Sequence, residues 1–229
     1  ERRQVTVVFA DISGFTALSE RLDPEEVSEI VNGCLGSLSQ VIYGFEGYID
    51  KFIGDCVMAL FGAPIAHEHD AEHAVHCSLD MMRCLEKYNA SIADRLESPL
   101  GLHIGINTGR VVAGKIGPDW KMDYTVMGDT VNIASRLEDL AKGGEILISE
   151  HTFNQVRDMF KLKDYGSIEV RGRRKPVRVF HVLGKKRGIR RPKREGILSA
   201  PMIGRDHEFE RLKGCFLKLK NGEGQVITV

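Results

Sequence analysis

Short apolar runs and longer amphipathic stretches alternate along the first hundred residues. Apolar runs of strand length lie at 4–10, 46–52, 56–62 and 101–107. Between them, apolar residues recur every three to four positions near 24–42 and near 70–94, which predicts two amphipathic helices. The first helix has a clear start, because Asp23 can cap it and Pro24 suits its first position. The expected order is therefore strand, helix, strand, strand, helix, strand.

This order is that of the ferredoxin-like βαββαβ unit. A strand at 122–126, a helix at 129–141 and a terminal helix-and-strand portion near 145–183 are appended to it. Alternating apolar runs flanked by helices favour one sheet covered on a face by helices. We therefore expect an α+β fold with an antiparallel-rich sheet.

Two aspartates lie where predicted strands end. Asp11 follows the first strand in VVFADISGFT, and Asp55 lies between two strands in KFIGDCVMALFG. Carboxylates at open strand ends are hard oxygen ligands that can bridge Mg²⁺ or Mn²⁺ to a triphosphate. Each has an ordinary alternative when taken singly: Asp11 fits a helix N-cap or turn, and Asp55 fits a β-hairpin turn.

The segment after Asp11 adds a second feature. Before a polar, helix-favouring stretch, the predicted strand runs into Ile12, Ser13, Gly14, Phe15 and Thr16. Free backbone N–H groups in such a segment bind phosphate. We therefore expect a phosphate to lie on this segment, next to the cations.

A third segment, YTVMGDTVNIASR at 124–136, is typical of a strand end followed by a helix. Asn132 and Arg136 are four residues apart, so they share one helical face. An amide that bonds a sugar oxygen, one turn from a guanidinium that braces a phosphate, suits a reaction on a nucleotide. The alternative is a polar pair on the solvated side of an amphipathic helix.

In this order and spacing, FADISGFT, KFIGDCVMALFG and YTVMGDTVNIASR resemble the catalytic domain of class III nucleotidyl cyclases, the adenylyl and guanylyl cyclases. The resemblance covers about residues 4 to 184. It implies that Asp11 and Asp55 are the metal ligands, helped by the Ile12 carbonyl. It also implies that Asn132 orients the ribose and that Arg136 stabilises the pentavalent phosphate.

The same resemblance places the purine on Lys51 and Thr125, and the triphosphate on Arg171 in EVRGRRKPV, where the family usually has a lysine. Lys51 offers only donors, which suits the N1 acceptor of adenine, and the Thr125 hydroxyl can accept from the adenine 6-amino group. Guanylyl cyclases typically have Glu at the Lys51 position, so this pair predicts ATP as substrate. Lysine with threonine resembles the subclass of bicarbonate-responsive enzymes, which makes bicarbonate a candidate activator.

The expected reaction is attack of the ribose 3′-OH of ATP on its own α-phosphorus, with pyrophosphate leaving in line. Two divalent cations assist, Mg²⁺ or Mn²⁺ with Ca²⁺ as an alternative. The scheme requires no separate protein base, and no histidine is predicted to act as one. In the family, the metal ligands come from one protomer, and the purine-reading and transition-state residues come from its neighbour. Because this sequence holds both sets, we expect a homodimer with shared sites.

Two alternatives stay open at this point. One is a guanylyl or other nucleotide cyclase, against which Lys51 counts. The other is a catalytically silent cyclase-fold domain that senses nucleotide or acts as a scaffold. Such degenerate copies usually lose a metal aspartate, the asparagine or the arginine, and this sequence keeps all four residues.

Composition agrees with a cytoplasmic enzyme domain. The 229 residues are 42% hydrophobic, and 32 Lys and Arg residues balance 32 Asp and Glu residues, so no global charge attracts nucleic acid or a membrane. No apolar run approaches transmembrane length, and ERRQVTVVFA lacks the pattern of a signal peptide. The five cysteines form no CxxC pair and are expected to be reduced thiols.

Three stretches lie outside these motifs. His67, His69, His73 and His76 form a cluster, and the last three share a helical face at metal-ligand spacing, although a solvated helix start is favoured over a zinc site. After the catalytic domain at 1–184, a basic linker is expected at 185–201. Residues 202–229 resemble the truncated start of an AAA or STAND-type ATPase module, with a helical tail as the alternative, and they contain no Walker A motif.

Overall fold

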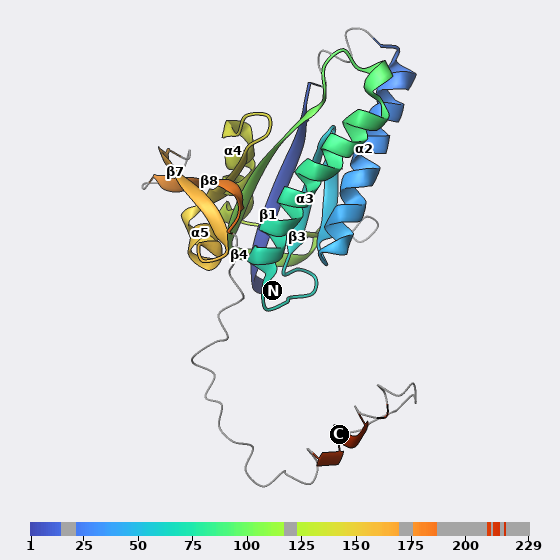
Figure 1. The fold of residues 1–229 in the computed structure, drawn as a ribbon. Coiled ribbons are helices and arrows are strands. Elements are labelled where there is room, and N and C mark those ends of the chain that lie inside the picture. Colours follow the sequence, from blue (N-terminus) through green and yellow to red (C-terminus); the bar gives the residue numbers. More distant parts are fainter. Residues whose placement is uncertain are drawn as a thin grey trace. The chain divides into compact units, whose positions relative to one another are not determined.

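The computed structural model describes residues 1–14, 22–116, 123–169 and 176–186, together with helical residues between 210 and 218 (Figure 1). The chain divides into two units, Glu1–Arg187 and Gly188–Val229. The first unit holds the sheet and the helices that cover it. The stretches predicted as a basic linker and as the start of an ATPase module lie almost entirely outside the described residues.

The first unit is built on one sheet with strand order β2-β3-β1-β4-β6-β8-β7, and β5 pairs with β4 outside this path. Its strands are β1 (Arg2–Ser13), β2 (Tyr48–Ile53), β3 (Cys56–Phe61), β4 (Gly101–Ile116), β5 (Asp123–Met127), β6 (Ile146–Ser149), β7 (Phe160–Ile168) and β8 (Val177–Lys185). Among the described strands, only β4 and β6 pair in parallel. The predicted α+β fold with an antiparallel-rich sheet is confirmed.

Two long helices, α2 (Pro24–Gly44) and α3 (Asp70–Ser91), lie side by side on one face of the sheet (Figure 1). A third helix, α4 (Asp129–Leu140), packs against β4 and β1. The remaining helical elements are η1 (Ala93–Arg95) and α5 (Glu150–Val156). Pro24 is the first residue of α2, as predicted, and Asp23 occupies the N-cap position without a side-chain cap hydrogen bond.

The alternation along β1 builds two cores, because successive side chains of a strand point to opposite faces. Val8, Ala10 and Ile12 are buried in the cluster that contains α2 and α3. Val5 and Val7 belong to a second cluster on the other face. Like Val5 and Val7, Asp11 is an odd-numbered residue of β1, so its side chain points to the face opposite α2 and α3.

β4 is longer than the predicted strand at 101–107. It continues to Ile116, and its last five residues, Val112–Ile116, pair with β5. Val111 of β4 and Val126 of β5 are buried in the cluster that holds Val5 and Val7 of β1, so both strands contribute to the core on that face of the sheet. β5 also lies close to β2, where Thr125 contacts Asp50, although these two strands are not paired in the sheet.

Gly105 of β4 allows α4 to lie directly on the sheet. A Cβ atom at this position would overlap the backbone N of Glu138 and the carbonyl oxygen of Ala134, both in α4. The close approach fixes which side chains of α4 reach the strands beneath. Among the described helices, none is long and apolar enough to cross a membrane.

Candidate active site

Asp11 and Asp55 are brought together by the register of β1 and β3. Asp11 pairs with Cys56 of β3 and with His103 of β4. Gly54 and Asp55 form the turn between β2 and β3, and Gly54 has φ 66°, a left-handed conformation that suits glycine. Asp55 is therefore the neighbour of the residue that pairs with Asp11. The sequence-based grouping of these two carboxylates is reproduced by the fold.

The electrostatics of Asp11 suit a cation site. Burial raises the pKa of Asp11 to about 6, with further contributions from the negative charges of Asp55 and Glu138. His103 and a hydrogen bond from the Ile12 backbone act in the opposite direction. The carboxylates of Asp11, Asp55 and Glu138 together carry more negative charge than the imidazole of His103 can balance. A divalent cation would relieve this repulsion, and carboxylate oxygens are the ligands that Mg²⁺ and Mn²⁺ prefer.

His103 and Glu138 were not found by sequence reasoning, which predicted no histidine at the site. The His103 Nε2 atom lies 3.0 Å from Glu138 Oε1 and 3.4 Å from Asp11 Oδ2. The hydrogen bond to Glu138 raises the pKa of His103 above its ordinary value, Asp11 adds to the rise, and burial opposes it. Ligand atoms of Asp11, His103 and Glu138 all lie within 4.8 Å of one another. His103 and Glu138 can therefore orient the Asp11 carboxylate, or all three side chains can share a cation.

The strand that carries Asp11 also extends further than predicted. Ile12 and Ser13 pair with Leu102 and Gly101 of β4, so the chain leaves the sheet only at Gly14. Ile12 is buried at this end of the sheet, whereas its neighbour Asp11 is half-buried. The other two residues predicted to bind phosphate, Phe15 and Thr16, lie outside the described residues, as does Arg171.

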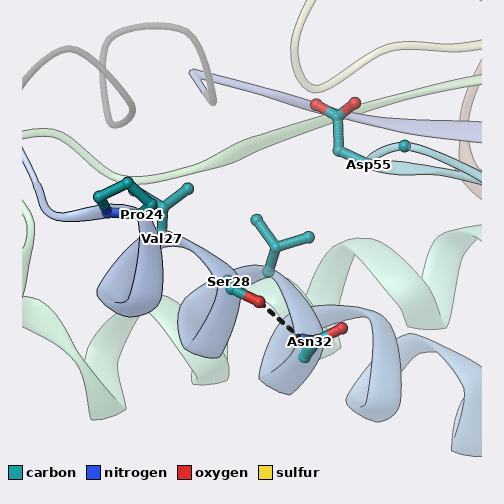
Figure 2. Close-up of a pocket in the computed structure, with 7 residues that line it drawn as sticks. Pro24, Val27, Ser28, Asn32 and Asp55 are labelled. Carbon is teal, nitrogen blue, oxygen red and sulfur yellow. Dashed lines mark hydrogen bonds between the residues drawn. The ribbon is translucent and has the colours of Figure 1, made fainter.

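A pocket of about 450 Å³ adjoins Asp55. Its other walls come mainly from the first turns of α2, through Pro24, Val27, Ser28, Val31 and Asn32. Figure 2 shows Asp55 across the pocket from these residues, where Asn32 Nδ2 donates a hydrogen bond to Ser28 Oγ at 3.2 Å. The volume is within the range of small-molecule sites. A ligand held at Asp55 would therefore have room on the α2 side of the carboxylate.

The two predicted purine contacts, Lys51 and Thr125, are joined by a residue that the sequence did not single out. Lys51 Nζ lies 3.1 Å from Asp50 Oδ2, and the Thr125 hydroxyl donates to the same oxygen at 2.9 Å. Lys51 comes from β2 and Thr125 from β5. An edge-to-face contact between Tyr48 and Tyr124, with ring centroids 6.2 Å apart, holds these strands together. The fold thus brings Lys51 and Thr125 together at one carboxylate oxygen.

Asn132 and Arg136 do not point at the aspartates of their own chain. Both are exposed on α4, and Arg136 Nη1 contacts Asp139 Oδ2 at 3.1 Å, also in an exposed position. Glu138, which reaches His103 beside Asp11, is two residues further along and so lies about 200° around the helix from Arg136. A single chain therefore separates its predicted transition-state residues from its predicted metal ligands.

The histidine group around the start of α3 pairs mainly with acidic side chains. His67 Nε2 and His73 Nδ1 each lie 3.9 Å from Glu46 Oε2, and His69 Nδ1 lies 3.5 Å from Glu72 Oε1. Within the described part of the chain, these histidines do not bring three ligand atoms as close together as the atoms around Asp11. The favoured interpretation, a solvated helix start, is consistent with this geometry.

Comparison with known proteins identifies the family. The chain matches the adenylate and guanylate cyclase catalytic domain over residues 1–184. It is 36% identical to adenylate cyclase 1 of Rhizobium meliloti (strain 1021) over 190 residues, which is 82% of this chain and 29% of that protein. The chain thus spans less than a third of the length of this relative.

Two solved structures resemble the fold closely. The adenylyl cyclase CyaB from P. aeruginosa has a TM-score of 0.79 and 39% identity, covering 82% of this chain and 98% of that chain. The guanylyl cyclase Cya2 has a TM-score of 0.78 and 36% identity, covering 83% of this chain and 96% of that chain. The chain, with its two strand-end aspartates and its helix bearing Asn132 and Arg136, therefore belongs to the adenylate and guanylate cyclase catalytic domain family.

Proposed function

We propose that this cyclase domain converts ATP to 3′,5′-cyclic AMP and pyrophosphate. The choice of ATP is supported chiefly by the Lys51 and Thr125 pair on Asp50, because its donors and acceptors match the N1 and 6-amino edge of adenine. In the reaction, a bond forms between the ribose 3′ oxygen and the α-phosphorus. The bond from the α-phosphorus to the β-phosphate oxygen breaks, and the hydroxyl proton leaves to solvent.

Asp11, Asp55 and the Ile12 carbonyl would hold two divalent cations, Mg²⁺ or Mn²⁺. The pKa of Asp11, which burial raises most and the negative charges of Asp55 and Glu138 raise further, supports this assignment. When bound, such cations supply Lewis acidity toward the 3′-OH and the triphosphate. His103 and Glu138 hold the Asp11 carboxylate in one orientation from the side of β4 and α4. Beyond the end of β1, residues 14–16 would place their amides on the phosphates, with Arg171 on the triphosphate.

Two chains would build each site. Asn132 would orient the ribose and Arg136 would stabilise the pentavalent phosphorus, but both lie on a different side of α4 from Glu138 and hence from Asp11. Next to Asp55, Phe52 and Ile53 leave about half of their surfaces exposed. Exposed apolar side chains beside an incomplete site suit contact with a second copy. A homodimer related by a two-fold axis would complete two sites at once.

The wider setting is proposed from the resemblance of the sequence. Bicarbonate is the candidate activator, because the lysine and threonine pair is similar to that of bicarbonate-responsive cyclases. A cytoplasmic location suits an enzyme that uses ATP. Residues 202–229 would open an ATPase module of the AAA or STAND type.

Guanylyl cyclase activity is the second candidate, since Cya2, a guanylyl cyclase, matches this chain almost as well as CyaB does. Purified protein incubated with ATP or GTP and Mg²⁺ or Mn²⁺, with mass identification of the product, distinguishes the two. The proposal expects cyclic AMP with a higher kcat/KM for ATP. Cyclic GMP as the main product at equal nucleotide concentrations would contradict it.

A further inference from the structure

We propose that Asp50 sets the base preference of this enzyme by fixing the hydrogen of the Thr125 hydroxyl. The inference rests on the proposed function, because it concerns how the same site selects ATP. Asp50 is a positioning residue in this account. It would contact the purine only through Thr125 and Lys51.

A β-bulge places Asp50 where it can do this. In β2, Ile49 is opposite Ala59 and Lys51 is opposite Met58, so Asp50 is the extra residue of the pair. Neighbouring side chains of a regular strand point to opposite faces, whereas a bulge redirects one of them. Here the bulge lets the carboxylate of Asp50 meet the ammonium group of Lys51, its neighbour in sequence, at 3.1 Å.

The carboxylate is buried while the two groups it holds reach outward. The side chain of Asp50 is 0% exposed, and that of Lys51 is 47% exposed. One oxygen, Oδ2, receives both Lys51 and Thr125, and the other, Oδ1, is buried without a hydrogen-bond partner among the described residues. Burying a carboxylate is unfavourable unless it is paired. The interactions of Asp50 Oδ2 with Lys51 and with Thr125 are therefore strongly favoured over a state in which either one is lost.

The pairing fixes which way the Thr125 hydroxyl points. An ionised carboxylate only accepts hydrogen bonds, so the single hydroxyl hydrogen of Thr125 is directed at Asp50. The lone pairs of the Thr125 oxygen are left for the nucleotide. A free hydroxyl would both donate and accept, but in this position it can only accept from a ligand.

This polarity selects adenine over 6-oxopurines. The 6-amino group of adenine donates to the Thr125 oxygen, and its N1 accepts from Lys51. Guanine and hypoxanthine present a carbonyl oxygen to Thr125 and an N1–H to Lys51. Two acceptors then face each other at Thr125, and two donors face each other at Lys51. Buried polar groups left unpaired in this way discriminate strongly between ligands.

The test compares ATP, ITP and GTP in wild type and in Asp50→Asn. ITP has the 6-oxo edge of GTP without its 2-amino group, so the ATP to ITP ratio of kcat/KM isolates the contact in question. The asparagine has nearly the same shape as aspartate, but its amide can donate to Thr125 and release the hydroxyl hydrogen toward a 6-oxo group. We expect the ATP to ITP ratio to fall by about tenfold, the effect of one opposed hydrogen bond.

A double-mutant cycle separates this role from a general effect on the pocket. In a Thr125→Val background no hydroxyl remains, so Asp50→Asn should lose most of its effect on the ratio. Thr125→Ser, which keeps a hydroxyl on the same carboxylate, should retain the wild-type ratio. If Asp50→Asn does not fold, as judged by thermal unfolding, the Ser and Val pair decides the question. Equal ATP to ITP ratios in those two variants would overturn the proposal.

The remaining outcomes are also distinct. A wild type that prefers ATP and a folded Asp50→Asn enzyme with an unchanged ratio would overturn the role of Asp50 alone. An undiminished effect of Asp50→Asn in the Thr125→Val background would overturn it as well, since Asp50 would then act by another route. A wild type that prefers GTP or ITP would contradict the proposed function itself.

Discussion

Replacing Asp11 by asparagine should stabilise the metal-free protein while it abolishes activity. The substitution keeps the shape and the acceptor oxygen that faces His103, but it removes a negative charge that burial disfavours most and that Asp55 and Glu138 also oppose. A rise of the Asp11 pKa from 3.8 to about 6 corresponds to roughly 3 kcal/mol. The Asp11 side chain is 27% exposed, so solvent screening reduces the gain expected above pH 6 to about 1–2 kcal/mol.

The pH dependence gives the sign of this effect. The folded state has the higher pKa at Asp11 and binds more protons than the unfolded state between pH 4 and 6. The contribution of Asp11 to stability therefore falls as pH rises through this window. The advantage of Asp11→Asn over wild type should be near zero at pH 4 and fully developed above pH 6.

Urea unfolding with EDTA at pH 4.5 and pH 7.5 measures this difference. Asp139→Asn, which removes an exposed carboxylate on α4, is the control and should show no gain at pH 7.5. Adding Mg²⁺ at pH 7.5 should reduce the difference in the free energy of unfolding between Asp11→Asn and wild type, because a cation stabilises only the wild-type site. An Asp11→Asn protein that is no more stable than wild type at pH 7.5 would refute the reasoning. A gain in the free energy of unfolding over wild type that is equal at both pH values would refute it as well.

Three further predictions follow from the site and its support. Asp55→Ala should abolish cyclic-nucleotide formation with little change in thermal unfolding, because the side chain is partly exposed at a turn and is proposed to bind a cation. Retained turnover would remove Asp55 from the proposed metal site. Lys51→Glu should lower the ATP to GTP ratio of kcat/KM by tenfold or more, since it sets an acceptor against adenine N1, and competition assays would expose an unchanged ratio. Gly105→Ala should destabilise the domain by about 1–3 kcal/mol in urea unfolding, because α4 must move off β4; a neutral effect would show that α4 is loosely packed there.

The sequence predicted those parts of the site that depend on local pattern. Asp11 lies two residues before the end of β1 and Asp55 directly before β3, and both lie at one end of the sheet because β1 and β3 pair antiparallel. Lys51 and Thr125 were paired through family resemblance, and the structure brings them to one carboxylate. Apolar runs were enough to place the two aspartates near strand ends, whereas the pairing of Lys51 with Thr125 came from the resemblance alone.

The missed residues depend on long-range geometry. His103 reaches Asp11 only through the β1 and β4 register, and Glu138 joins it only because Gly105 lets α4 approach the sheet. Asp50 looked like one more polar residue of a hairpin strand, because a β-bulge leaves no mark in hydrophobic alternation. Neither a strand register nor a bulge can be deduced from the pattern of a single segment.

Mixing two inactive variants tests most directly whether this chain is an adenylyl cyclase with sites shared between protomers. Asp11→Ala keeps Asn132 and Arg136 intact, and Arg136→Ala keeps the metal ligands intact. With random exchange about half of the dimers are heterodimers, each with one complete site of two, so the mixture should recover roughly a quarter of wild-type cyclic AMP formation. A mixture that stays at the background of the separate variants, once subunit exchange has been demonstrated, would contradict the shared site.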